Sequence, residues 1–356
     1  MIEILFSYIL ALNPFYIPAI LTMLCFCVFL WIPTSRVLGI KPYKAKQRIH
    51  DLEIPRFGGL IIFSLLYIFI IYGHINESDH DHVVCLLSLC SIPIFCVGLY
   101  EDISQNTHPY LRLFSMFIAA TMALIVTNIA LPSLSFPFFG PIISDSFLIY
   151  PFLIISIVIF INGMNMIDGS NGLLSLTAIC QLASIIFISI QSGDLNNIDI
   201  TVMLIVALIC FLPFNYPFGK IFLGDLGAYM YGFFIAFITI RFYGDNPTVP
   251  SWGAVLILFY PLIEVFFSYF RKIFLDKLSP FSADLDHIHL KIFYVFNYKI
   301  SKKISNNLVM PTLSILWLSP VILYTWFYDS VLGLVLALLI LVLIYFGLYW
   351  AIPRYK

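Results

Sequence analysis

The sequence contains few charged residues. Asp, Glu, Lys and Arg make up only 10% of its 356 residues, whereas 61% are hydrophobic; soluble globular chains are typically about a quarter charged. The formal net charge is −1, which argues against a nucleic-acid partner, because nucleic acids attract strongly basic surfaces. This composition excludes an ordinary soluble protein and favours a protein embedded in a lipid bilayer.

Cysteine pairs and a basic leader are also missing. The seven Cys include no C-x-x-C pair and no zinc-ligand spacing, and six of them lie inside apolar segments, so we interpret them as packing residues. No Lys or Arg precedes Arg36. Because a signal peptide begins with basic residues, we expect the first apolar segment to remain in the protein as a membrane span.

Long apolar segments dominate the rest of the chain. About eleven of them reach the length at which a helix crosses the ~30 Å hydrocarbon core, and none shows the alternation of a barrel strand. They cover about 13–33, 58–73, 83–100, 111–131, 147–162, 172–191, 199–217, 226–243, 252–270, 310–328 and 331–351. Because unpaired backbone groups are costly in lipid, the sequence predicts an all-α integral membrane protein, a polytopic helix bundle that forms one domain over residues 1–356.

The positions of Lys and Arg predict the orientation of this bundle. If the N-terminus lies outside, 17 of the 18 Lys and Arg fall on the inner side and Arg241 alone falls outside. Cytoplasmic loops are enriched in Lys and Arg, so we expect a cytoplasmic C-terminus. The inner loops also hold most clustered polar residues, so we expect an active site facing the cytoplasm, formed by about 34–57, 101–112, 162–171, 215–225 and 271–309.

The first inner loop carries cations next to a pair of glycines. Lys46 and Arg56 precede Gly58 and Gly59. The basic residues fit either an anchor at the inner membrane surface or phosphate contacts, for which the planar donor fork of Arg56 is suited. The two glycines indicate a close approach of backbones.

The second inner loop follows two adjacent carboxylates, Glu101 and Asp102, at the end of a span. Adjacent carboxylates repel each other, which favours a nearby cation or a group that takes up a proton; a solvated helix end is the simpler alternative. Arg112, at the start of the next span, is a candidate for binding phosphate or for pairing with this dyad.

The third inner loop begins with polar residues spaced by three. Asn162, Asn165 and Asp168 fall near one another on one face of a helix end, and Asn171 follows in a Gly-rich turn. Such a turn can direct backbone and carboxamide donors at an anion. A turn that merely caps the next span is the alternative, but capping needs only one such residue.

Asp225 adds a further carboxylate on the same side. It lies at the start of a span, where an N-cap is the structural alternative. With Asp102, Asn165 and Asp168 it makes an oxygen-rich set of the kind that Mg²⁺ uses, commonly through one or two carboxylates together with phosphate oxygens and water.

The last long inner loop contains Asp284, Asp286, His287 and His289. Zinc is the weaker alternative for these residues, since only two His are close together and no Cys joins them; we interpret the His as contacts to a pyrophosphate, with a solvated loop as the alternative. Glu264 lies inside a predicted span. An acid there is costly unless it is paired or hydrated, so it is either a site residue or a carboxyl satisfied by a neighbour.

As a set, these motifs resemble the polyprenyl-phosphate N-acetylhexosamine-1-phosphate transferases, a family of glycosyltransferase family 4 type that includes the peptidoglycan phospho-muramoyl-pentapeptide transferase as a relative. The resemblance rests on Glu101-Asp102, the run from Asn162 to Gly172, Phe222-x-Gly-Asp225 and His287-x-His289, in order over roughly residues 40 to 295. An eleven-span layout with an outer N-terminus also matches the sugar-transferring branch.

The resemblance implies a reaction and a cofactor. Undecaprenyl phosphate would attack the β-phosphorus of a UDP-sugar, UMP would leave, and the lipid-linked sugar pyrophosphate would initiate a cell-surface polysaccharide such as O-antigen. Mg²⁺, with Mn²⁺ as an alternative, would offset the charge on the diphosphate. The enzyme would work in the bacterial inner (plasma) membrane, and a homodimer is left open.

The resemblance also implies a role for each motif residue. Asp225 and Asn165 would contact the metal; Asp102, Asp168, Glu101 and His289 would be catalytic; Asn162, Asn171, His287, Arg56, Lys46 and Arg112 would bind substrate. Asp102 would contact or deprotonate the lipid phosphate, although that phosphate is already largely ionised near neutral pH.

Two departures from the family pattern bear on these roles. The acidic pair is usually Asp-Asp, and here it is Glu101-Asp102; the His loop is also reduced compared with relatives that carry three His. The reduced His loop leaves the sugar open: N-acetylglucosamine is the default, and N-acetylated 6-deoxyhexoses are the alternative. The rival class is a polytopic secondary transporter or lipid-linked sugar flippase, although related halves, which many transporters have, are not visible here. The Asp-Gly-x-x-Ala-Arg signature of CDP-alcohol phosphotransferases is absent.

Overall fold

The computed structural model describes residues 54–75, 82–137, 139–279 and 286–353, and every regular element in these ranges is helical. The helices are α3 (Gly58–Ile75), α4 (His82–Cys90), α5 (Ile92–Ser104), α6 (Pro109–Val126), α7 (Phe139–Ser144), α8 (Ile149–Ile167), α9 (Leu173–Ser192), α10 (Ile198–Asn215), α11 (Gly224–Asp245), α12 (Trp252–Ile257), α13 (Phe259–Phe270), the π-helical turn η2 (Arg271–Leu275), α14 (Ile288–Asn297), α15 (Lys302–Thr312), α16 (Ser314–Trp317), α17 (Ser319–Phe327) and α18 (Val331–Ala351). The predicted all-α architecture is confirmed for this part of the chain. The first predicted span, at 13–33, and Lys46 lie outside the described residues.

The long helices are apolar enough to cross a bilayer. Within the described ranges, seven helical stretches have the length and composition of membrane spans, or eight if α4 and α5, which meet at a bend of 44°, count as one. The chain is thus a multi-span membrane protein. The prediction of eleven spans and of the side that each loop faces stays a prediction.

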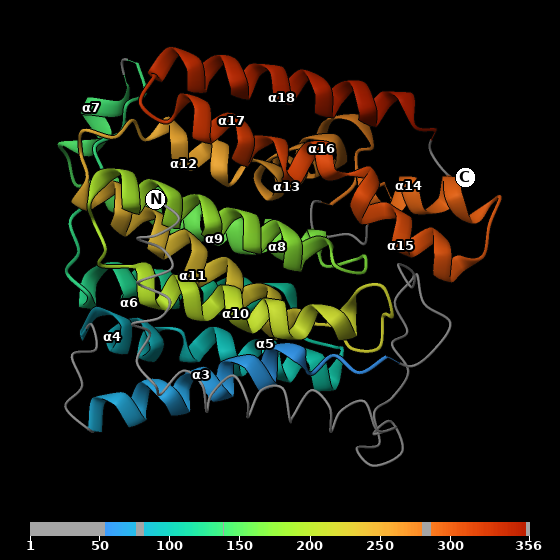
Figure 1. Cartoon of the computed structure of the whole chain (residues 1–356), viewed down its shortest axis with the longest axis horizontal. Coiled ribbons are helices and arrows are strands. Elements are labelled where there is room, and N and C mark those ends of the chain that lie inside the picture. Colours follow the sequence, from blue (N-terminus) through green and yellow to red (C-terminus); the bar gives the residue numbers. More distant parts are fainter. Residues whose placement is uncertain (1–53, 76–81, 138, 280–285, 354–356) are drawn as a thin grey trace.

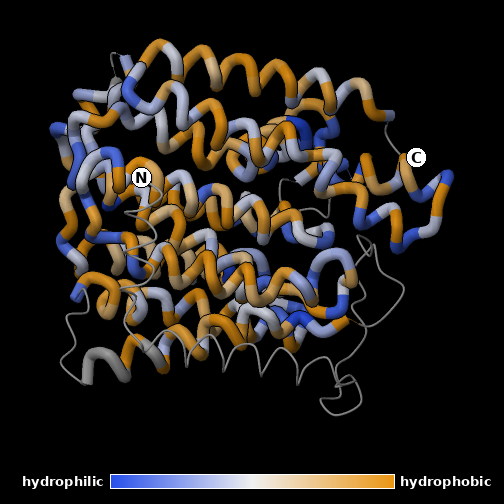
Figure 2. Tube along the Cα trace, viewed as in Figure 1, coloured by the Kyte–Doolittle hydropathy of each residue, from blue (hydrophilic) through white to orange (hydrophobic). Residues whose placement is uncertain are grey.

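The helices lie side by side with roughly parallel axes, and the chain runs back and forth between two ends of the bundle (Figure 1). The turns that follow α5, α8 and α10 lie at the same end as α14 and α15, whereas α7 lies at the opposite end. We call the former the site end. Hydrophobic residues cover the middle of the long helices, and hydrophilic residues gather at the ends and along α14 and α15 (Figure 2).

Helix α11 is the central helix of the bundle. Of its most apolar 18-residue stretch, 94% is buried inside the protein, and the helix packs against α3, α5 and α8. Glycines permit this packing: a Cβ on Gly59 of α3 would lie 2.4 Å from the Cα of Gly227, and a Cβ on Gly98 of α5 would lie 2.6 Å from the Cα of Leu226. The close approach predicted at Gly59 is therefore confirmed.

Several predicted boundaries were wrong. The predicted span 252–270 is broken at Leu258 into α12 and α13, because Pro261 has no N–H to donate to the carbonyl of Ile257. Helix α8 continues to Ile167, five residues beyond the predicted end. The predicted loop 271–309 contains η2, all of α14 and the start of α15. The candidate span that corresponds to the predicted 310–328 starts earlier, at Lys302, and runs through α15, α16 and α17 to Phe327.

Candidate active site

A short stretch of backbone pairing places Arg56 at the N-terminus of α11. The N–H groups of Gly58 and Gly59 donate to the carbonyls of Phe222 and Leu223 at 3.0 and 2.8 Å, and Phe222 donates back to Pro55. The loop before α3 therefore runs beside the loop before α11. Residues 169 positions apart in sequence, Arg56 and Asp225, meet as a result, with 2.7 Å between guanidinium Nη2 and carboxylate Oδ1.

Asp102 binds the first turn of α11 with both carboxylate oxygens. The backbone N–H of Asp225 donates to Oδ1 at 2.8 Å and that of Leu226 to Oδ2 at 3.0 Å. The free N–H groups and the dipole of a helix N-terminus favour such an anion. Asp225 itself occupies the first turn and is not the N-cap, so that alternative was wrong: the capping carboxylate comes from α5. The expected contact between Asp102 and the lipid phosphate stays a prediction.

Gly224 makes this arrangement sterically feasible. Its φ of +79° lies in the left-handed region, and a Cβ there would lie 2.5 Å from Asp102 Oδ2 and 2.5 Å from the carbonyl of Arg56. A side chain at this position would therefore both strain the backbone and displace the Asp102 carboxylate.

Carboxylates outnumber cations in this cluster. Arg56 Nε also lies 3.6 Å from Asp102 Oδ1. Burial raises the pKa of the Asp168 carboxyl well above its ordinary value; the Arg56 guanidinium opposes this rise, and the carboxylates of Asp225 and Asp102 add to it. These four side chains, Arg56, Asp102, Asp168 and Asp225, form what we call the carboxylate cluster.

The carboxylate cluster has an unsatisfied oxygen. Asp168 Oδ2 is buried and has no hydrogen-bond partner among the described residues, a costly arrangement unless a cation or donor arrives. No three His, Cys, Asp or Glu side chains in the described ranges converge closely enough to hold a metal ion on their own. Mg²⁺, however, commonly takes only one or two protein carboxylates and completes its shell with phosphate oxygens and water, so these residues fit it.

The polar run after α8 divides into two parts. Asn162 and Asn165 lie within the helix, and Asp168 is the residue at its C-terminal cap. Asn162 Nδ2 donates to the carbonyl of Val158 at 2.8 Å and lies 3.4 Å from Met116 Sδ, so this carboxamide turns back toward its own helix. Asn165 is half-buried. Neither role implied by the resemblance, substrate binding for Asn162 or metal contact for Asn165, is tested by these contacts.

Asn171 is held by asparagines from another part of the chain. Its Nδ2 donates to Asn307 Oδ1 at 2.9 Å, and its backbone N–H donates to Asn306 Oδ1 at 3.1 Å. The next N–H, of Gly172, donates to Asn215 Oδ1 at 2.6 Å. These contacts fix the turn between α8 and α9, while substrate binding by Asn171 stays a prediction. Asn215, Asn306 and Asn307 were not predicted as site residues, although carboxamides on the same predicted side of the membrane were a usable signal.

Glu101 and Arg112 flank the carboxylate cluster. Glu101 Oε2 accepts the N–H of Thr107 at 2.8 Å and so fixes the loop between α5 and α6. Arg112, at the start of α6, lies beside Tyr229 and within electrostatic reach of Asp225 and Glu101. The predicted pairing of a cation with the acidic dyad thus involves Arg56 directly and Arg112 at longer range.

The His loop reaches the same site. His289 is buried at the start of α14, and a Cβ on Gly169 would lie 2.4 Å from His289 Nε2, so this ring packs on the backbone next to Asp168. The His287 and His289 rings are nearly parallel, with centroids 5.6 Å apart. Asp284 lies outside the described residues.

Comparisons with known proteins agree with this geometry. The family described as "Glycosyl transferase family 4" matches residues 84–243. The chain is 28% identical over 256 residues to the undecaprenyl-phosphate alpha-N-acetylglucosaminyl 1-phosphate transferase of Thermotoga maritima. The aligned residues cover 72% of each chain. This chain is thus similar, over the matched residues, to glycosyl transferase family 4 and to the polyprenyl-phosphate N-acetylhexosamine-1-phosphate transferases. It is accordingly an enzyme, a membrane-embedded phosphotransferase.

This chain is similar to other relatives of the same kind. It is 24% identical over 257 residues, 72% of this chain and 70% of the other, to a probable undecaprenyl-phosphate N-acetylglucosaminyl 1-phosphate transferase of Bacillus subtilis. It is 31% identical over 231 residues, 60% of this chain and 64% of the other, to a putative UDP-N-acetylglucosamine–dolichyl-phosphate N-acetylglucosaminephosphotransferase of Saccharolobus solfataricus. The family match includes Asp102, Asp168 and Asp225, whereas Arg56 and the His loop lie outside it.

Proposed function

We propose that this transferase moves a sugar 1-phosphate from a UDP-sugar to undecaprenyl phosphate and releases UMP. One observation carries the proposal: three carboxylates and one guanidinium gather at the site end between the family's sequence motifs, and Asp168 Oδ2 among them is buried without a hydrogen-bond partner in the described part of the chain. The names of the Thermotoga maritima and Bacillus subtilis relatives support the same reaction class.

The bond changes are those of a phosphoryl transfer. An oxygen of the lipid phosphate attacks the β-phosphorus of the UDP-sugar, a new P–O bond forms, and the bond from the β-phosphorus to the bridging oxygen breaks as UMP leaves with that oxygen. The lipid phosphate is already largely ionised near neutral pH, so the nucleophile needs little help from a base. Positioning and charge stabilisation are the main tasks left to the protein.

The carboxylate cluster suits a divalent cation and the diphosphate that accompanies it. Asp225, in the first turn of α11, would hold Mg²⁺, with Mn²⁺ as an alternative, and Asn165 and Asp168 lie at the C-terminal end of α8 on the same side of the bundle. When bound, the cation supplies Lewis-acid stabilisation of the charge that builds on the diphosphate. Asp102 holds the backbone of Asp225 in place through the first turn of α11, and Arg56 keeps the Asp225 side chain directed into the cluster.

The finer parts of the proposal concern the sugar and its use. We take an N-acetylhexosamine as the sugar, N-acetylglucosamine by default, because the names of the Thermotoga maritima and Bacillus subtilis relatives specify N-acetylglucosaminyl 1-phosphate as the group transferred. The product would initiate a cell-surface polysaccharide such as O-antigen, and the protein would lie in a bacterial inner membrane with its site end toward the cytoplasm. The positive-inside distribution of Lys and Arg supports that orientation.

The test is UMP release by the purified protein, given undecaprenyl phosphate, Mg²⁺ and a panel of UDP-sugars. We expect release that depends on both the lipid and the metal, stops with EDTA, and is fastest with UDP-N-acetylglucosamine. Asp225→Asn protein is the negative control. Silence across the panel from folded protein, combined with binding of a lipid-linked sugar, would contradict the proposal and favour the flippase alternative.

A further inference from the structure

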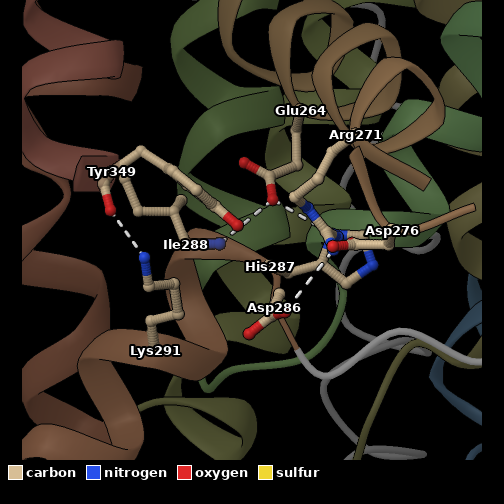
Figure 3. A network of polar contacts seen from close by, with 8 residues as sticks. All are labelled: Glu264, Arg271, Asp276, Asp286, His287, Ile288, Lys291 and Tyr349. Carbon is tan, nitrogen blue, oxygen red and sulfur yellow. Dashed lines mark hydrogen bonds and ion pairs between the residues drawn. The ribbon is translucent and has the colours of Figure 1, made fainter. Parts of the chain in front are cut away.

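Glu264, the buried acid whose purpose the sequence left open, is the centre of a second polar network at the site end. It lies on α13 with 1% of its surface exposed. Its Oε1 lies 3.0 Å from Nδ1 of His287 and accepts the N–H of Ile288 at 3.1 Å, and its Oε2 accepts the hydroxyl of Tyr345 at 2.9 Å. Figure 3 shows the Oε1 contacts, in which the side chain reaches from α13 to the first residue of α14.

The contacts of Glu264 determine which nitrogen of His287 carries a proton. Ile288 and Tyr345 are both donors to this carboxyl group, so it acts as an acceptor throughout. An acceptor next to Nδ1 requires a proton on Nδ1. Nε2 is then the ring nitrogen that carries the lone pair and acts as an acceptor.

The segment around His287 is held from several sides. Arg271 of η2 pairs with Asp286, the preceding residue, at 3.5 Å and with Asp276 at 2.5 Å. Lys291, one turn further along α14, donates to the carbonyl of Tyr349 and lies over its ring, 3.8 Å from the centroid. Figure 3 shows these charged side chains around the start of α14. Contacts besides those of Glu264 therefore also hold the backbone around His287, and the contact to Nδ1 acts on its ring.

The His287 ring leads directly to the carboxylate cluster. It stacks on His289, and His289 Nε2 packs against Gly169, the residue after Asp168. An arrangement in which a buried carboxylate orients one imidazole nitrogen and leaves the other toward the reactants is a recurrent way of fixing a functional histidine.

We propose that Glu264 is a positioning residue, which holds the His287 ring with Nδ1–H toward α13 so that Nε2 faces the nucleotide-sugar side of the reaction. The identity of the substrate in this inference rests on the proposed function. The orientation of the His287 ring does not depend on that function and can be measured without turnover.

The kinetic test compares Glu264→Leu with Glu264→Gln. Leu has nearly the same volume but no acceptor, whereas the Gln carbonyl can replace Oε1 and keep both of its contacts. We expect Glu264→Leu to lower kcat/KM for the UDP-sugar about 10- to 100-fold, the range found when hydrogen-bond partners of functional histidines in metal sites are removed. Glu264→Gln should restore the rate to within about threefold of wild type.

A double-mutant cycle separates positioning from a general loss of structure. If Glu264 acts through His287, Glu264→Leu should add no further loss in a His287→Ala background. Losses that multiply in the double variant, or a Glu264→Leu protein with the wild-type kcat/KM, would overturn the proposal. Tyr243→Phe is the matched control, since it removes a buried 2.9 Å hydrogen bond to Tyr324 outside the site.

Nitrogen-15 NMR of labelled histidines gives a readout that needs no substrate. The signal that disappears in His287→Ala should report a protonated Nδ1 in the wild type and in Glu264→Gln, and should change in Glu264→Leu. If the wild type releases no UMP but shows this signature, the proposed function fails while the positioning holds. If UMP is released and the signature is absent, the positioning fails alone.

Discussion

Two polar networks lie at the same end of the bundle, and they differ in whether their buried carboxylate oxygens have hydrogen-bond donors. In the carboxylate cluster, Asp168 retains an oxygen without a hydrogen-bond partner within the described residues. In the network around Glu264, both carboxylate oxygens accept hydrogen bonds from fixed donors. A satisfied network acts as a rigid frame, whereas one with excess negative charge is suited to receive a cation. The difference indicates that the first network binds and the second positions.

The largest loss of activity is expected from Asp225→Asn. It replaces one of the three carboxyl groups of the cluster by a neutral carboxamide but keeps the side-chain volume and an oxygen for Arg56. We expect UMP release to fall by at least about 100-fold, the scale of losing one charge-stabilising group, with the protein still folded. Asp245→Asn, at the other end of the same helix and paired with Arg241, is the matched control. Equal rates for the two variants would contradict the site assignment.

Arg56→Met tests whether the carboxylates that pair with the Arg56 guanidinium can also bind a metal cation. Without it, Asp102 and Asp225 lose their shared partner, and we expect a loss of about 1–3 kcal/mol in stability without metal. Mg²⁺ should then raise the melting temperature more than it does in the wild type. Arg241→Met, at the far end of α11, should leave the Mg²⁺-dependent shift unchanged. A smaller shift in Arg56→Met than in the wild type would show that Arg56 is needed to form the metal site.

The sequence was sufficient to predict the apolar helices and the end at which the motifs gather, because span length and the Lys and Arg distribution are local properties. It was sufficient to select Asp102, Asp168 and Asp225 as one set. It was insufficient to predict that Asp102 caps α11 or that Glu264 contacts His287. These contacts depend on helix rotation and on packing between α5, α11, α13 and α14, which hydropathy does not encode. The breaks in α12–α13 and α15–α17 were missed because apolar composition hides a helix interruption.

The raised pKa of Asp168 makes metal binding depend on pH. Burial favours its protonated form, whereas a cation binds the deprotonated carboxylate. As pH rises, protons compete less, so we expect the Mg²⁺ concentration that gives half-maximal UMP release to fall. Metal titrations at a series of pH values measure this, and the Asp168→Asn variant should lose the dependence. A half-saturating concentration that stays constant with pH in the wild type would remove Asp168 from the metal-binding step.

The smallest effect should come from Tyr345→Phe, which removes one donor from the network around Glu264. The Tyr345 hydroxyl donates to Glu264 Oε2, whereas His287 and Ile288 use Oε1. Removing it leaves the ring contact intact, so we expect kcat/KM to stay within about threefold of wild type and stability to fall by about 1 kcal/mol. Kinetics and thermal unfolding, with Tyr324→Phe as the control for loss of a buried tyrosine hydroxyl, measure the two effects separately. A loss as large as that of Glu264→Leu would mean that the orientation of the carboxylate, and not Oε1 alone, holds His287, because only a rotation of the Glu264 side chain links Tyr345 to that ring.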